Sequence, residues 1–293
     1  MTGMYQPATE APAAAAARRR AYWQSAMERA FETQAAMRTQ QVEECGEGLA
    51  SIADGIAAAG LEVQFSETRI AGSFPRLFYI RESLLPPLVA IAREMNDRGW
   101  ILRIEEGFRT IEMQRALITS PEAFAAIVRC CAWESARQVP PADLVFRRAQ
   151  CLVANYPLNG THMYGAAVDV SVYDRDSGEE VSRGEPYLHM GVATPMDSPF
   201  VSDEARANRR EITAMMERHG FMHYHGEFWH YNQGDVLYEM VMESGRPARF
   251  GPVHWCPEDQ TVRPYEDMHA PLVSLENLEQ AIARVTCGAG GDR

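Results

Sequence analysis

The segment HGFMHYHGEFWHYNQGD, residues 219–235, contains four of the chain's eight histidines together with one glutamate and one tryptophan. Imidazole and carboxylate groups bind catalytic zinc ions and move protons. In an extended strand, His223, His225 and Glu227 would share one face. His230 breaks that alternation. It can face the same ligand only if the chain turns after the glycine that precedes Glu227, and glycine permits such a turn.

A second segment, NGTHMYGAAVDVSVYD at residues 159–174, ends in a predicted strand. Its alternation places the valines on one face and Asp169 on the other. A catalytic zinc site needs about three protein ligands of the His, Asp or Glu type, with an open position for water and a separate base. If His162, Asp169 and His230 are the ligands, Glu227 is left free to act as the base.

These two segments carry a resemblance to a known family. THMYGAAVD resembles the pattern Ser-x-His-x-x-Gly-x-Ala-x-Asp, and GEFWH resembles the motif Glu-x-Trp-His, of zinc D-alanyl-D-alanine peptidases, the group that contains the VanX-like dipeptidases. EEGFRT is similar to the arginine-bearing segment that precedes both motifs in that family. RFGPVHW is similar to a stretch that follows them in the dipeptidase branch. The resemblance runs from about Phe65 to Glu258.

The resemblance implies a role for each matching residue. His162, Asp169 and His230 would bind Zn²⁺, one ion per chain, and Glu227 would be the general base. Arg109 would stabilise the oxyanion of the tetrahedral intermediate, because a fixed guanidinium suits charge that develops in a transition state. His223 and His225 are then expected to be bystanders, with a second metal site as the alternative.

The same resemblance assigns three residues to the substrate. Thr161 stands where the family usually has serine, which keeps a hydroxyl and adds a methyl group. HMGVATPMDS is similar to the family's Met-Gly-Thr-Pro-Phe-Asp, with two extra residues, and makes Asp197 a candidate partner for a substrate ammonium. Trp229 is a third candidate contact, although a packing wall suits its residue type better.

The elements around these residues predict an α+β fold, because strands are interspersed irregularly with helices. The strand ILRIEE would end just before Arg109, where loops usually carry function. A long loop is predicted at 183–201. Helices are predicted after Ser83, twice between Thr110 and Trp133, from Asp203 to His219 and from Leu275 to Thr286. By resemblance, the domain is a small antiparallel sheet flanked by helices, like the hedgehog and D,D-peptidase domains.

Two parts of the chain differ in composition. Residues 1–60 are predicted to form a disordered start followed by one or two alanine- and glutamate-rich helices, an N-terminal appendage to the domain. A surface helix that packs on the domain and a helix that forms a homo-oligomer are the two readings of this appendage. Residues 61–293 are predicted to form the catalytic domain.

The net charge and the hydropathy of the chain restrict the classes of partner and the location that we expect. Forty acidic and 28 basic residues give a formal net charge of −12. This charge would repel a phosphate backbone, so nucleic acid is not expected as a partner. The sequence offers no secretory signal and no stretch of about 18 apolar residues, so we expect a cytoplasmic protein without a membrane span.

The resulting hypothesis is a zinc dipeptidase that hydrolyses the small peptide D-Ala-D-Ala to D-alanine. A D,D- or L,D-carboxypeptidase acting on peptidoglycan peptides would use the same catalytic residues and is the first alternative. A zinc-binding module without catalysis is the second alternative, because a fold alone does not fix function.

Overall fold

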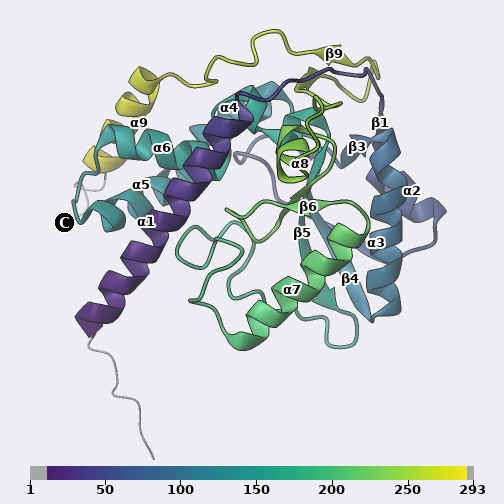
Figure 1. The fold of residues 1–293 in the computed structure, drawn as a ribbon, viewed down its shortest axis with the longest axis horizontal. Coiled ribbons are helices and arrows are strands. Elements are labelled where there is room, and N and C mark those ends of the chain that lie inside the picture. Colours follow the sequence, from purple (N-terminus) through teal and green to yellow (C-terminus); the bar gives the residue numbers. More distant parts are fainter. Residues whose placement is uncertain (1–11, 289–293) are drawn as a thin grey trace, which may run out of the picture.

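A computed structural model describes residues 12–288 (Figure 1). The prediction of a disordered start falls mainly on residues that lie outside this range. Five strands form the main sheet, in the order β2-β4-β5-β7-β6. Their bounds are β2 (Val63–Phe65), β4 (Trp100–Glu106), β5 (Ala167–Asp174), β7 (His230–Asn232) and β6 (Met222–His223).

Helices pack around this sheet and account for most of the regular structure. Short strands form two further pairs, β1 (Leu49–Ser51) with β3 (Tyr79–Arg81) and β8 (Val253–His254) with β9 (Arg263–Pro264). The α-helices are α1 (Pro12–Met37), α2 (Ile52–Ala58), α3 (Leu85–Asp97), α4 (Ile111–Ile118), α5 (Pro121–Ser135), α6 (Ala142–Val153), α7 (Asp203–Arg218), α8 (Val236–Val241) and α9 (Leu275–Gly288). The 3₁₀ turns are η1 (Glu82–Leu84), η2 (Pro157–Asn159) and η3 (Thr161–Tyr164).

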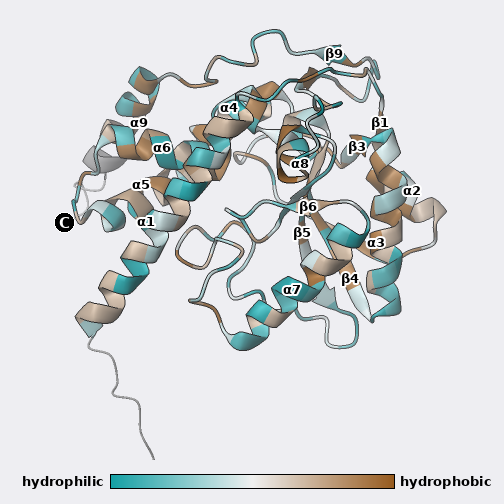
Figure 2. Cartoon of the chain, in the orientation of Figure 1, coloured by the Kyte–Doolittle hydropathy of each residue, from teal (hydrophilic) through white to brown (hydrophobic). Residues whose placement is uncertain are grey.

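The α+β prediction is confirmed, with one difference in the sheet. Strands β4, β5, β7 and β6 pair antiparallel, but β2 runs parallel to β4. A parallel pair needs a crossover connection, and here it is formed by the segment that contains β3 and α3. The ribbons of β4 and β5 carry the colours of hydrophobic residues over much of their length in Figure 2, whereas much of α7 is coloured as hydrophilic. The sheet therefore forms the centre of the core.

Strand register brings the chemical groups together. Glu106 at the end of β4 lies opposite Asp169 on β5, and Asp169 lies opposite His230 on β7. Opposite residues in neighbouring strands have their side chains only about 4.5–5.5 Å apart at Cβ. Three residues that are distant in the sequence therefore share one patch of the sheet.

The N-terminal segment packs on the rest of the described chain. Helix α1 lies across α5 and α6 in Figure 1, and Trp23 and Met27 are fully buried there. The Trp23 indole donates to Glu134 on α5 at 2.9 Å. Strand β1 pairs with β3 across the predicted boundary. The alanine-rich composition concealed this packing, because alanines and a glutamine make up half of the buried face.

The length and hydropathy of the helices bear on whether the chain could span a membrane. Within residues 12–288, no single helix is both long and apolar enough to cross a bilayer, although α4 and α5 together, bent by 48°, meet the length and composition criteria.

Candidate metal centre and substrate pocket

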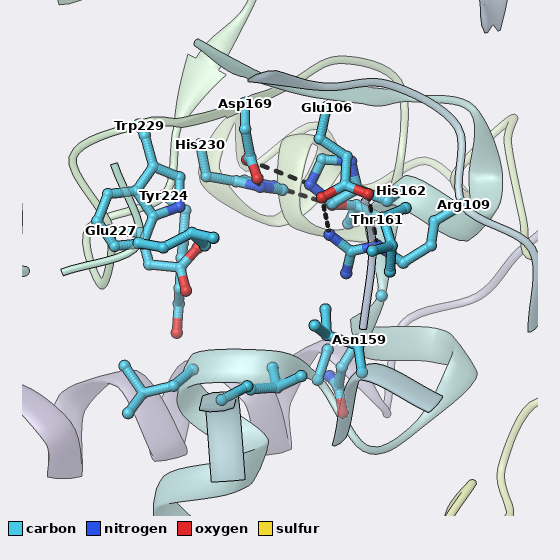
Figure 3. Close-up of a pocket in the computed structure, with 18 of the residues that line it drawn as sticks. Glu106, Arg109, Asn159, Thr161, His162, Asp169, Tyr224, Glu227, Trp229 and His230 are labelled. Atoms are coloured by element: carbon cyan, nitrogen blue, oxygen red, sulfur yellow. Dashed lines mark hydrogen bonds and ion pairs between the residues drawn. The ribbon is translucent and has the colours of Figure 1, made fainter. Parts of the chain in front are cut away.

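The three predicted ligands lie together at the sheet. His162 Nε2 is 3.2 Å from Asp169 Oδ1, and His230 Nδ1 is 3.0 Å from the same oxygen (Figure 3). All three side chains are buried, and one potential ligand atom from each lies within 4.8 Å of the others. Two imidazoles and one carboxylate are a usual ligand set for catalytic zinc. Within the described part of the chain, no other group of three such residues is this close.

Hydrogen bonds fix which imidazole atoms face this centre. His162 Nδ1 lies 2.8 Å from the Gly107 carbonyl oxygen, to which it can only donate. A neutral His162 therefore carries its lone pair on Nε2. His230 Nε2 lies 3.0 Å from the Thr161 hydroxyl, so its Nδ1 is turned toward Asp169. Two imidazole nitrogens and a carboxylate that converge in a buried site are a donor set that fits a metal ion.

The charge on Asp169 is maintained by its neighbours. Burial alone would raise the pKa of Asp169, but His162 and His230 outweigh it and hold that pKa well below its usual value. Tyr187 donates to the second carboxylate oxygen, Oδ2, at 2.9 Å. Burial raises the pKa of Tyr187 well above its usual value, which keeps the phenol protonated as a donor.

The turn after β4 positions His162. The Arg109 backbone N–H donates to the His162 carbonyl at 3.1 Å, and Gly107 accepts from the His162 ring. A Cβ at Gly107 would lie 2.9 Å from the Tyr79 carbonyl oxygen. Only glycine fits this close backbone approach.

Glu227 stands on the pocket wall and is not one of the three grouped residues. The chain turns between β6 and β7, so the hairpin brings Glu227 to one side of the ligands and Arg109 lies on the other side (Figure 3). Burial raises the pKa of Glu227 well above its usual value, and the negative charge of Asp169 adds to this rise. The positive charge of Arg109 and a hydrogen bond with Trp229 act to lower the pKa of Glu227.

Arg109 is held in a buried ionic network. Its Nε and Nη2 bond the two carboxylate oxygens of Glu106 at 3.1 and 2.7 Å, and its Nη1 bonds Gln114 at 2.6 Å. Arg76 binds the same Glu106 carboxylate at 2.9 Å. Burial opposes ionisation of Glu106, but the two arginines outweigh it and lower the pKa of Glu106. Three of the five N–H donors of Arg109 are used in these bonds.

The three predicted substrate contacts have different surroundings. Thr161 lines the pocket, but its hydroxyl contacts His230, and it directly precedes His162, whereas the family pattern has one residue between serine and histidine. Trp229 also lines the pocket and packs edge-to-face on Tyr187 with centroids 5.6 Å apart. Asp197 is exposed, contacts Tyr22 at 2.9 Å and Arg29 at 3.7 Å, and is not among the pocket residues.

His223 and His225 lie outside the group of three residues. His223 Nδ1 lies 2.7 Å from Glu217 on α7. His225 lies in the turn between β6 and β7, and its pKa is lowered by burial and by the charge of Arg29. Neither residue belongs to a three-ligand group in the described chain.

A pocket of about 260 Å³ opens beside the ligands. Helices α1, α4, α5 and α6 form its far side, and Leu188 and Met190 of the predicted 183–201 loop also line it. Most of its wall is apolar. Such a concave apolar site with a few polar groups is typical of small-molecule binding.

Comparison with known proteins shows which family part of the chain resembles. Residues 132–244 match the sequence model of a family described as D-ala-D-ala dipeptidase, and this range contains His162, Asp169, Glu227 and His230. This part of the chain is therefore similar to the D-ala-D-ala dipeptidase family. Arg109 lies outside the matched residues.

This chain also resembles individual proteins. It is 30% identical over 92 residues to a D-alanyl-D-alanine dipeptidase of Enterococcus faecalis, a match that covers 31% of this chain and 46% of that protein. The chain thus spans less than half the length of this relative. A Synechocystis sp. D-alanyl-D-alanine dipeptidase is 26% identical over 232 residues, which cover 70% of this chain and 90% of that protein.

A solved structure is also similar. It is a zinc complex of a mutant of the vancomycin resistance D,D-pentapeptidase VanY, with 17% identity and a TM-score of 0.34. The similarity covers 65% of this chain and 97% of that one.

Three residues of the site were not found from the sequence. Glu106 could have been found as the acid three residues before Arg109, and Tyr187 lies in the loop that was expected to be functional. Gln34 gave no such signal, because it lies on a helix that was assigned to an appendage.

Proposed function

We propose that this chain is a metallopeptidase that binds one Zn²⁺ and hydrolyses D-Ala-D-Ala to D-alanine. The observation that carries the proposal is the buried His162, Asp169 and His230 group with Glu227 beside it on the pocket wall. The family model and the dipeptidase relatives support the same substrate.

The metal would be held by His162 Nε2, His230 Nδ1 and a carboxylate oxygen of Asp169. When bound, zinc acts as a Lewis acid that polarises a carbonyl and makes water a better nucleophile near neutral pH. Tyr187 and Thr161 keep two of these ligands in position through the hydrogen bonds described above. Such outer contacts set ligand orientation.

Glu227 is the base in this proposal. Its carboxylate takes a proton from the attacking water and then gives it to the leaving amine, so that a single group acts twice. Burial, which raises the pKa of Glu227, makes the second transfer easier because the protonated form is less disfavoured. The hydrogen bond with Trp229 orients the carboxyl group in the pocket.

Arg109 stabilises the oxygen that becomes negative when water attacks the carbonyl. Glu106 and Gln114 hold the guanidinium rigidly, and its remaining donors are available to the substrate. A preorganised donor of this kind acts without reorganisation during the reaction.

Replacing Arg109 with lysine is therefore expected to reduce kcat/KM about 10²- to 10³-fold, the usual cost of losing one oxyanion donor. Lysine keeps the charge but cannot form the paired bonds to Glu106. Steady-state kinetics and thermal melting of the same preparation check this expectation. A variant that melts earlier but retains wild-type turnover would assign Arg109 to stability alone.

A D,D-carboxypeptidase that trims longer peptides is the second candidate, and the position of Asp197 favours it. A free dipeptide carries an ammonium group, which needs an anionic partner when buried. Of the carboxylates that line the pocket, Asp169 faces the metal ligands, Glu106 is paired with two arginines and Glu227 is the base. Glu122 remains, exposed on α5. A longer peptide would have a neutral amide in place of the ammonium group of the free dipeptide.

The substrate experiment separates these candidates. Zinc-quantified protein is incubated with D-Ala-D-Ala, L-Ala-L-Ala and a pentapeptide that ends in D-Ala-D-Ala, and released alanine is measured. We expect selective cleavage of free D-Ala-D-Ala. Faster cleavage of the pentapeptide would establish the carboxypeptidase, and one bound zinc without any cleavage would contradict both candidates.

A further inference from the structure

Helix α1 contributes an unsatisfied polar atom to the pocket. Gln34 lines the pocket and is only 4% exposed. Its Nε2 lies 3.3 Å from the Tyr224 hydroxyl, but its Oε1 is buried and has no hydrogen-bond partner in the described chain. A buried acceptor without a donor is costly, and such atoms often have a ligand as their partner.

The position of Gln34 is fixed relative to the metal centre. Asn159 Nδ2 donates to the Gln34 carbonyl at 2.8 Å, and Arg38 bonds both that carbonyl and Asn159 Oδ1 at 3.3 Å. Asn159 precedes His162 by three residues and lies below the ligands in Figure 3. The loop that carries the first ligand is therefore tied directly to helix α1.

Tyr224 connects Gln34 to the opposite side of the pocket. The Tyr224 ring lies 6.2 Å from the His230 ring, and its backbone N–H donates to the His230 carbonyl at 3.1 Å. The Tyr224 carbonyl accepts from the Glu227 N–H at 3.3 Å. Gln34 thus contacts a side chain from the turn that carries Glu227, and both residues line the pocket that holds the three ligands.

The chemistry around Gln34 selects the kind of group it receives. Its pocket neighbours include the apolar side chains of Met37 on α1, Leu152 on α6 and Leu237 on α8. A lone carbonyl oxygen in an apolar wall accepts one N–H and offers nothing to an anion. Peptide substrates supply such a donor as an amide N–H or as an ammonium.

We propose that helix α1 is a wall of the substrate site, with Gln34 Oε1 accepting a hydrogen bond from an N–H group of the peptide. This assignment rests on the proposed peptidase function. Gln34 is then a substrate-binding residue that lies outside the family match at 132–244. Met37, one helical turn further along α1, lines the same pocket.

The test replaces Gln34 with methionine, which has a similar length but no acceptor. Two matched variants accompany it. Gln24→Met makes the same change at an exposed position of α1, and Tyr224→Phe removes the hydroxyl that Gln34 also contacts. KM and kcat are measured for D-Ala-D-Ala and N-acetyl-D-Ala-D-Ala, with thermal melting and zinc content as controls.

Gln34→Met is expected to raise KM about 3- to 10-fold, the effect of one neutral hydrogen bond, with smaller change in kcat. Gln24→Met should stay close to wild type, and Tyr224→Phe, which removes a partner of Gln34 Nε2 but leaves Oε1 in place, should raise KM less than Gln34→Met does. A penalty on both substrates shows that the donor is an N–H that both substrates carry, and a penalty on the free dipeptide alone identifies the ammonium.

Three results would overturn the assignment. Wild-type KM in Gln34→Met shows that the amide does not contact substrate. An equal penalty in Tyr224→Phe shows that Gln34 acts only by positioning Tyr224. A zinc-loaded wild type that cleaves neither substrate refutes the proposed peptidase function and this assignment with it, and that result is distinct from the other two.

Discussion

Glutamine in place of Glu227 is expected to lower kcat by about 10²- to 10⁴-fold, the range that a positioned general base contributes. Glutamine has nearly the same shape and can still accept a hydrogen bond from Trp229, but it cannot take a proton from water. Zinc content should equal that of wild type, because Glu227 lies apart from the His162, Asp169 and His230 group. KM should change little, since the variant keeps the pocket wall.

The measurement is turnover of D-Ala-D-Ala by protein whose zinc content has been determined. Glu204→Gln is the matched control, because Glu204 is exposed on α7 and does not line the pocket. This control should retain turnover. If Glu227→Gln binds zinc and keeps full turnover, the assignment of the base is wrong.

Alanine in place of His230 is expected to abolish both zinc binding and turnover. Even changes in residues that only orient a metal ligand cost about 10- to 100-fold in affinity or activity, so losing a ligand should cost more. Thr161→Val, which removes the hydroxyl next to His230 Nε2, is expected to fall within that smaller range. The two variants should therefore show a large and a smaller loss of zinc affinity or turnover, both acting at the same imidazole.

Zinc content after dialysis and thermal melting with and without a chelator provide the readouts. A ligand that binds only the folded state raises its stability, so chelation should lower the Tm of wild type. It should leave the Tm of His230→Ala unchanged. His223→Ala is the control, because His223 pairs with Glu217 and lies outside the ligand group. Unaltered zinc binding in His230→Ala would contradict the proposed metal centre.

The sequence predicted the fold class and most elements because each depends on local patterns. Alternation along β5 placed Asp169 away from the valines, and the glycine before Glu227 allowed the turn between β6 and β7. Helix α7 was predicted to within one residue, since its apolar spacing and the glycine after it act locally. Strand β2, which joins the sheet in parallel, was not predicted because pairing between distant strands leaves no local signal.

The roles of single residues were predictable only where a motif fixed both type and spacing. His162, Asp169, His230 and Glu227 were found in this way, and the structure brings the first three within 4.8 Å of one another. Asp197 was assigned from a stretched motif. The structure instead places it against Tyr22 of α1, where it is exposed.

What the sequence by itself determined was the identity of the chemical groups, since two imidazoles, two carboxylates and a guanidinium in ordered motifs already define the chemistry. Tertiary structure decided how they are used. The register of β4, β5 and β7 places Glu106, Asp169 and His230 side by side, and Glu106 then pairs with Arg109. Packing of α1 against α6 brings Gln34 to the pocket. The strand register and the packing of α1 both depend on contacts between residues far apart in the chain. Burial of the shared core brings these residues together, and no local pattern encodes their closeness.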